Sequence, residues 1–187
     1  MLKKRAELLA QIRSFFARAG VMEVDTPVLG EFGVTDLHID CVTATVNGAP
    51  RYLQSSPEYY MKRLLAAGAG PIYYLGKVFR DEELGRRHRT EFTMLEWYRP
   101  GWDEHQLMDE VAALIGTLTT ESLAVAKRSY GEVFAEITGL NPHSAGTSDL
   151  ACCADQHCGG DWQQETRTTL LDLLFSMVVE PRLPDGL

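Results

Sequence analysis

The sequence contains no run of about 18 apolar residues, the length that a helix needs to cross a bilayer. Its beginning, MLKKRAELLAQIRSFF, distributes charges among apolar residues, unlike the apolar centre of a signal peptide. These two features argue against a membrane span and a secretory leader. We therefore expect a soluble, cytoplasmic protein.

Basic charge and cysteine are also scarce. The chain has 26 acidic against 18 basic side chains and a net charge of -8, which argues against a surface built mainly to hold nucleic acid. Its four cysteines are too few for a disulfide framework in a chain of this length. Cys152, Cys153, His157 and Cys158 lie close together but contain no CxxC pair, so we expect no metal site there.

What the sequence does contain is enough apolar material for a core. It has 187 residues, 45% of them hydrophobic and 24% charged, which is typical of a single globular domain. No internal repeat or low-complexity tract interrupts it. We therefore expect one domain over residues 1–187.

Helices and strands can be expected along most of the chain. The Asn47-Gly48 dipeptide, flanked by β-branched residues, predicts a two-stranded hairpin with a type I′ turn. Ser56 as N-cap and Pro57 at the first helical position predict the start of a short helix. Helical spacing is found in residues 4–19, 103–118, 129–140 and 163–178, strand patterns in residues 21–29, 72–79 and 91–98, and loop composition in residues 141–149.

The segment FRDEELGRRHRTEFTMLEWYRP places charge of both signs between two predicted strands. Alternation along the second strand puts Phe92, Met94, Glu96 and Tyr98 on one face. Guanidinium groups suit phosphate oxygens, an aromatic ring suits a purine, and carboxylates suit amino groups. The segment therefore indicates a site for a nucleoside triphosphate and an amine. The alternative that the pattern leaves open is an exposed hairpin with mutually compensating surface charges.

Two segments resemble known motifs. VMEVDTPVL resembles motif 1 of the class II aminoacyl-tRNA synthetases, and FRDEELGRRHRTEFTMLEWY resembles their motif 2 in its lysine-specific form. SPEYYMKRLL and TMLEWYRP further resemble the elongation factor P lysine lysyltransferases, a synthetase-like family without tRNA specificity. The resemblance implies an α+β fold, with an antiparallel sheet flanked by helices, and a homodimer with Pro27 near its interface.

The resemblance also implies roles for individual residues. Arg80 would contact the α-phosphate of ATP and act as the catalytic residue, and Phe92 would stack on adenine. Further ATP contacts would be Asp81, Glu82, His88 and Arg89. The site for lysine or β-lysine would be lined by Ser56, Pro57, Glu58, Glu96 and Tyr98. The family pattern His-Asn-Pro-Glu is replaced here by HRTE, so Arg89 stands where an asparagine is usual.

By the same resemblance, the protein would use ATP to activate lysine or (R)-β-lysine and transfer it to a lysine of elongation factor P. Binding of tRNA is not expected. The segment RLPDGL follows where the relatives continue toward motif 3, so we expect a catalytic domain that is incomplete at its C-terminus, with Mg²⁺ held by the missing part. The alternatives are a catalytic fragment of a lysyl-tRNA synthetase and an inactive truncated remnant.

Overall fold

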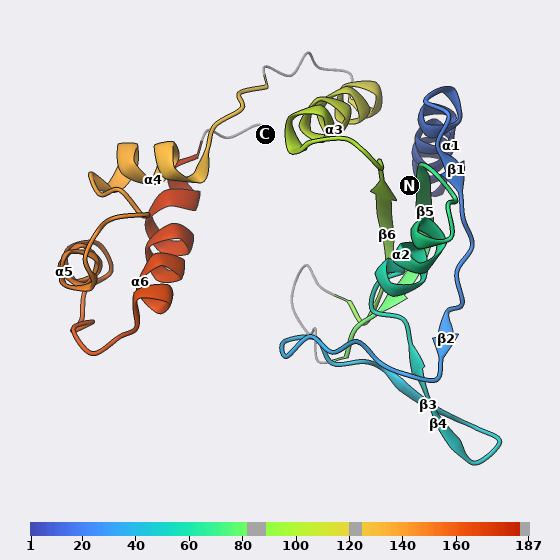
Figure 1. The fold of residues 1–187 in the computed structure, drawn as a ribbon, viewed down its shortest axis with the longest axis horizontal. Coiled ribbons are helices and arrows are strands. Elements are labelled where there is room, and N and C mark those ends of the chain that lie inside the picture. The colour runs from blue at the N-terminus through green and yellow to red at the C-terminus, as the bar shows by residue number, and fades with distance from the viewer. Residues whose placement is uncertain (82–88, 120–124, 184–187) are drawn as a thin grey trace. The chain divides into compact units, whose positions relative to one another are not determined.

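A computed structural model describes residues 1–81, 89–119 and 125–183 of the chain (Figure 1). It contains helices together with antiparallel and mixed sheets, so the predicted α+β class is confirmed. The chain divides into two compact units, Met1–Thr120 and Glu121–Leu187. That both units form one catalytic domain remains a prediction. None of the helices in the described ranges has the length and apolar character that crossing a bilayer requires.

The first unit is built on a sheet with the order β1-β5-β6. Strands β5 (Ile72–Phe79) and β6 (Glu91–Tyr98) pair antiparallel along their whole length and cover the two predicted ranges. Strand β1 (Met22–Glu23) lies parallel to β5 at the edge. The prediction of one strand over residues 21–29 was therefore wrong in extent. Pro27 has no N–H to donate to a ladder, and the chain leaves this sheet before it.

A second sheet has the order β2-β4-β3. Strands β3 (Thr43–Val46) and β4 (Ala49–Leu53) form the predicted hairpin, and β2 (Leu29–Gly30) pairs antiparallel with β4. Asn47 and Gly48 both have positive φ, at 52° and 76°, as a type I′ turn requires. The hairpin is therefore set by its turn residues.

Helices cover both faces of the first sheet. Helices α1 (Leu2–Arg18) and α3 (Glu104–Leu118) pack on one face, where fully buried Phe16 stacks on Tyr73 with ring centroids 4.5 Å apart. Helix α2 (Glu58–Ala66) packs on the other face, which carries the even-numbered residues of both strands. The buried residues on that side are Met61, Ile72, Tyr74 and Val78.

A polar cluster fastens the end of β6 to α3. Glu110 is only 6% exposed and forms an ion pair of 2.7 Å with Arg99, which is 11% exposed. The indole of Trp97 donates a second hydrogen bond to the same carboxylate, over 3.0 Å. Because both charges are paired and further hydrogen-bonded, the buried carboxylate is compensated.

The start of α2 differs slightly from the prediction. The helix begins at Glu58, and Pro57 is the N-cap, because the Pro57 carbonyl accepts the first helical hydrogen bond from the Met61 amide over 2.9 Å. The side chain of Ser56 still accepts a hydrogen bond, from the Glu58 amide over 3.3 Å. The Ser56 side chain therefore still caps the helix, but from the position before the N-cap residue Pro57.

The regular elements in the described part of the second unit are all helices. They are α4 (Tyr130–Thr138), α5 (Thr147–Cys158), α6 (Arg167–Leu174), the π-helix η1 (Phe175–Val179) and the 3-10 helix η2 (Glu180–Arg182). The predicted loop over residues 141–149 ends at Gly146, because Leu150 and Ala154 bury one face of α5 in the core. The helix predicted from residue 163 begins at Arg167, after the N-cap Thr166.

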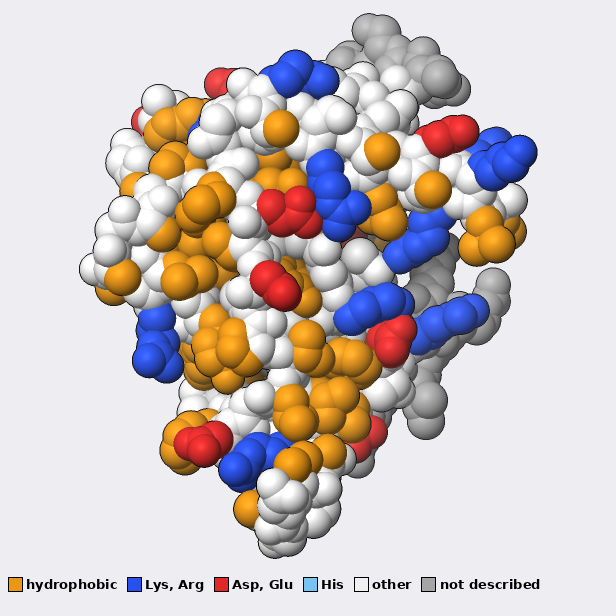
Figure 2. Space-filling view, turned by 90° about the vertical axis from the view of Figure 1, so that its right-hand side faces the viewer, with side chains coloured by type: hydrophobic (Ala, Val, Ile, Leu, Met, Phe, Trp, Pro, Cys, Tyr) orange, Lys and Arg blue, Asp and Glu red, His pale blue; other side chains and the backbone are white. Residues whose placement is uncertain are grey.

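One face of the first unit carries exposed apolar side chains. Figure 2 shows hydrophobic side chains gathered on the side where β1 and β2 lie in Figure 1. Met22 is 51% exposed, Val28 38% and Leu29 42%. These residues belong to the segment that resembles motif 1.

Candidate active site

Arg80 lies at the end of the β5–β6 hairpin. Its amide donates to the Thr90 carbonyl over 2.9 Å and so continues the ladder by one step beyond Phe79. Its side chain donates from Nε to the Ser55 carbonyl over 3.3 Å, and its guanidinium carbon lies 5.3 Å from the centre of the Phe92 ring. The structure therefore brings together the guanidinium group of Arg80 and the ring of Phe92, and their roles toward a nucleotide remain predictions.

The pairing register extends this face along the hairpin. Phe92 is opposite Val78, Glu96 opposite Tyr74 and Tyr98 opposite Ile72. Since strands rise roughly 3.3 Å per residue, Phe92 and Glu96 lie about 13 Å apart along β6. One sheet face thus presents an arginine and an aromatic ring at one end and polar side chains toward the other.

Two carboxylates and a lysine form a cluster at the second end of this face. Tyr98 donates its hydroxyl hydrogen to Glu96 over 2.8 Å. Glu58, in the first turn of α2, accepts a hydrogen bond from the Lys62 ammonium over 2.5 Å. Glu58 and Lys62 are both close enough to Glu96 for their charges to affect its ionisation. The cluster can therefore receive a positively charged amine.

Burial decides the protonation of this cluster. The pKa of Glu96 is raised above its usual value chiefly by burial, with the negative charge of Glu58 adding to the effect, while the Tyr98 hydrogen bond opposes it. The pKa of Tyr98 is raised by burial and by its bond to Glu96, so this hydroxyl remains a donor. An incoming cation would favour the ionised form of Glu96.

A buried glutamine connects this face to the preceding chain, and sequence patterns did not reveal it. Gln54 is 7% exposed and donates from Nε2 to the Tyr74 hydroxyl over 2.8 Å and to the Lys77 carbonyl over 3.1 Å. Its Oε1 accepts from the Thr26 hydroxyl over 3.1 Å. The residue after it, Ser55, supplies the carbonyl that Arg80 contacts. Gln54 therefore helps to place the backbone around Arg80.

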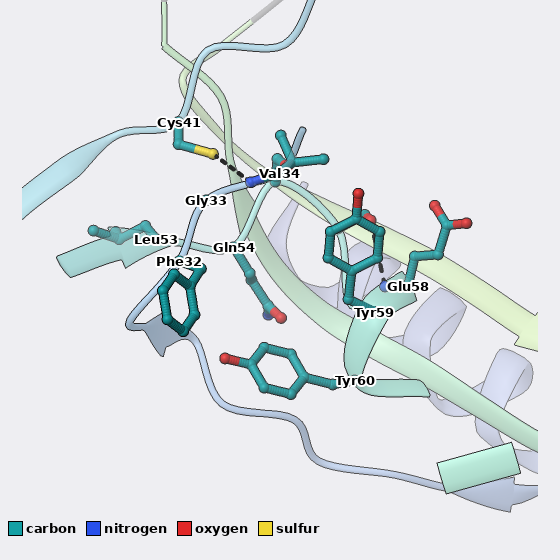
Figure 3. Close-up of a pocket in the computed structure, with 11 residues that line it drawn as sticks. Phe32, Gly33, Val34, Cys41, Leu53, Gln54, Glu58, Tyr59 and Tyr60 are labelled. Atoms are coloured by element: carbon teal, nitrogen blue, oxygen red, sulfur yellow. Dashed lines mark hydrogen bonds between the residues drawn. The ribbon is translucent and has the colours of Figure 1, made fainter. Parts of the chain in front are cut away.

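A small hollow lies beside the start of α2 (Figure 3). Its volume for water-sized groups is about 50 Å³. Phe32 and Tyr60 lie on one side of it, and the carboxylate of Glu58 points away from Tyr60. A side chain at Gly33 would place a Cβ 3.1 Å from the Tyr52 ring, so glycine lets the backbone pass close to that ring. The hollow borders the cluster but is too small for a whole amino acid.

The structure places the remaining predicted site residues in different surroundings, and two of them lie outside its described part. Ser56 and Pro57 lie beside Glu58, as expected from their sequence. Asp81 is exposed, and its amide donates to the Asp40 carbonyl over 2.8 Å. Arg89 is exposed at the base of the hairpin loop. Glu82 and His88 lie outside the described residues. The ligand roles of all these residues remain predictions.

The second unit contains three of the four cysteines, all of them free. Cys153 is buried in the helical core, whereas Cys152 on the same helix is exposed. Within the described ranges, the side chains of His, Cys, Asp and Glu form no group of three or more that could hold a metal ion.

A family model described as tRNA synthetases class II (D, K and N) matches residues 1–148. The chain belongs to this family. The match includes both motif-like segments, the hairpin with Arg80 and Phe92, and the Glu58 turn. The suspected class II resemblance is therefore confirmed, and the antiparallel β5–β6 pair belongs to a class II synthetase domain.

Individual relatives in the class II family are also similar. The elongation factor P (R)-β-lysine ligases of Haemophilus influenzae (strain PittGG) and Pasteurella multocida (strain Pm70) are each 48% identical over 97% of this chain. The protein of that name from Sodalis glossinidius (strain morsitans) is 44% identical over 97% of this chain. The chain spans 58% of the length of each of these three relatives.

Proposed function

We propose that this chain forms part of a ligase that uses ATP to activate lysine or (R)-β-lysine and transfers it to a lysine side chain of elongation factor P. The carrying observation is the single sheet face that holds Arg80 and Phe92 at one end and Glu96 and Tyr98 toward the other. The names and 44–48% identity of the relatives support the choice of substrates.

The proposed chemistry needs no nucleophile from the protein. The carboxylate of the amino acid attacks the α-phosphorus of ATP, pyrophosphate leaves, and an aminoacyl-adenylate forms. The acceptor amine then attacks the acyl carbon, AMP leaves, and an amide forms after loss of a proton. The protein contributes by positioning the reactants and by stabilising developing charge.

Arg80 and Phe92 would bind the nucleotide. A guanidinium group matches phosphate oxygens in geometry and remains charged, so Arg80 would stabilise the negative charge that grows on the α-phosphate. Phe92 would offer its ring to adenine. Asp81, Glu82, His88 and Arg89 would supply further ATP contacts.

Glu96 and Glu58 would hold the amino groups of the substrate. Burial of Glu96 strengthens its attraction for an ammonium group, since water screens the pair less. Tyr98 would orient the Glu96 carboxylate through the hydrogen bond that the structure contains. Ser56 and Pro57 would shape the turn from which Glu58 projects.

The described residues do not fit a magnesium site, because they bring together no group of three acidic or other ligating side chains. When bound, the ion would neutralise charge on the phosphate oxygens. Its ligands would lie in the portion of the longer relatives to which this chain has no match.

Binding of ATP tests the nucleotide half of the site. We expect ATP to bind to the native chain and Arg80→Ala to lower its affinity by at least tenfold, because hydrogen bonds between charged groups contribute roughly 1.5–3 kcal/mol each. Isothermal titration calorimetry would measure this. The control is Arg51→Ala, which removes an arginine of β4 in the other sheet that forms an ion pair with Glu31. Unchanged affinity in Arg80→Ala would remove Arg80 from the site.

ATP–pyrophosphate exchange with lysine and then (R)-β-lysine tests the reaction itself. Exchange would demonstrate adenylation by these 187 residues. A folded chain that binds ATP and lysine without exchange would be an inherited half-site whose activity requires additional residues.

Aminoacylation of tRNA is the second candidate, because the matching family model includes the lysine-specific synthetases. Transfer of lysine to tRNA by this chain would favour that function over modification of elongation factor P.

A further inference from the structure

Lys62 places an ammonium group of the chain itself among the carboxylates proposed to bind the substrate. Its Nζ lies 2.5 Å from Glu58 Oε1, and its positive charge acts on Glu96 as well. The two carboxylates come from different elements, α2 and β6, and Lys62 is hydrogen-bonded to Glu58 while its charge acts on Glu96. Lys62 was not among the site residues expected from the sequence.

We propose, on the basis of the function proposed above, that Lys62 occupies the substrate-ammonium position and that a substrate must displace it. Lys62 would then be a specificity-determining residue. Only a ligand whose own ammonium group can replace the lysine would regain the interactions with Glu58 and Glu96. An amino acid with a neutral side chain of similar length would leave Lys62 in place and gain nothing from the carboxylates.

The charges of the cluster favour such an exchange. Glu58 and Glu96 together carry two negative charges when ionised, and Lys62 compensates one of them. Without Lys62, the carboxylates would repel each other, and this repulsion disfavours ionisation of the half-buried Glu96. Lys62 therefore keeps both groups ready for a cation while competing with that cation.

The exposure of the pair makes the exchange easy. The side chain of Lys62 is 58% exposed and that of Glu58 is 44% exposed, so water can solvate the lysine after it leaves. A Glu–Lys pair at this spacing also stabilises a helix slightly. That structural role predicts a change in helix stability on removal of Lys62, but no selective change in ligand affinity.

The test measures binding of L-lysine and of L-norleucine, which has the same carbon chain without the side-chain ammonium. Isothermal titration calorimetry would compare the native chain with Lys62→Gln, Lys62→Arg and Arg63→Gln. The last variant removes a neighbouring exposed cation from the same helix. Circular dichroism would establish that each variant remains folded.

We expect Lys62→Gln to bind L-lysine about fivefold more tightly, because the substrate ammonium no longer has to displace an exposed ion pair, and such pairs are weak. Its affinity for norleucine should not change. Lys62→Arg, which retains the cation, and Arg63→Gln should behave like the native chain.

Every other result overturns the proposal. Equal or weaker lysine binding by Lys62→Gln would leave the amine site in place but remove Lys62 from it. A parallel gain for norleucine would indicate a general change in packing. If neither the native chain nor any variant binds lysine, the proposed amine site and the inference fail together, whereas ATP binding would still test the nucleotide site separately.

Discussion

Single residues on one sheet face carry most of the proposed chemistry. Arg80 contacts Phe92, and Glu96 accepts from Tyr98, so each proposed half-site already has an internal contact. Such contacts restrict the rotamers of these side chains before a ligand arrives. Part of the ordering cost of binding is thereby met during folding.

Glu96 should reduce stability at neutral pH. Its pKa is raised above the ordinary 4.5, so the folded state binds this proton more tightly than the unfolded chain does. The stability from this group is fully present below about pH 4.5 and is lost as the pH rises through the raised pKa. We expect Glu96→Gln to have a higher melting temperature than the native chain at pH 7 and no advantage at pH 4.

Thermal unfolding followed by circular dichroism at several pH values would measure this difference. Glu7→Gln, at an exposed position of α1, is the matched control. A Glu96→Gln variant that is less stable at pH 7, with a deficit that grows as the pH rises, would contradict the expected sign. The same variant should bind lysine more weakly, because the substrate ammonium loses a charged partner.

Packing of whole elements depends on the aromatic contact between α1 and the sheet. Phe16 is completely buried, stacks on Tyr73 and has its ring centroid 5.4 Å from that of Trp97. Removing it would leave a cavity between α1 and the sheet. Phe16→Ala should therefore lower the free energy of unfolding of the first unit by about 3–5 kcal/mol.

Denaturant titration would measure that loss, with Phe32→Ala as the control. Phe32 is 86% exposed, so the same truncation should change the free energy of unfolding by less than about 0.5 kcal/mol. Equal losses in the two variants would show that the contact between α1 and the sheet does not determine the stability of this unit.

The whole molecule is expected to associate with a second copy of itself, because residues 21–29, which resemble motif 1, carry exposed apolar side chains. A homodimer would cover the exposed side chains of Met22, Val28 and Leu29. Large exposed apolar patches often mark protein interfaces. We therefore expect a dimeric mass in solution and a monomer for Met22→Glu, which would bury a charge in that interface.

Sedimentation equilibrium would test this prediction. Met177→Glu is the matched control, because Met177 is 62% exposed but belongs to the helices of the second unit. A monomeric mass for the native chain would refute the homodimer, and a dimeric Met22→Glu would place the interface elsewhere.

The sequence by itself determined the local structure wherever short-range physics decides it. Asn47-Gly48 specified a type I′ turn, because few other residues accept positive φ at both positions. Alternating residues in 72–79 and 91–98 specified β5 and β6 and the shared face of Phe92, Glu96 and Tyr98. Resemblance of the motifs then indicated the class II family, which the family model confirmed.

Only the tertiary structure decided contacts between segments that are distant in sequence. Gln54 lies between Thr26 and Tyr74, although nothing in its own surroundings in the sequence required this. Likewise, the Glu58–Lys62 pair is local to α2, but only the packing of α2 on the sheet brings the pair close enough for its charges to act on Glu96 of β6. The start of α5 was wrongly predicted as loop over residues 147–149 for the same reason, because the burial of this helix depends on Leu170 and Leu174 from another helix. Periodicity records which face of an element is apolar, but the partner of that face is fixed only when the chain packs.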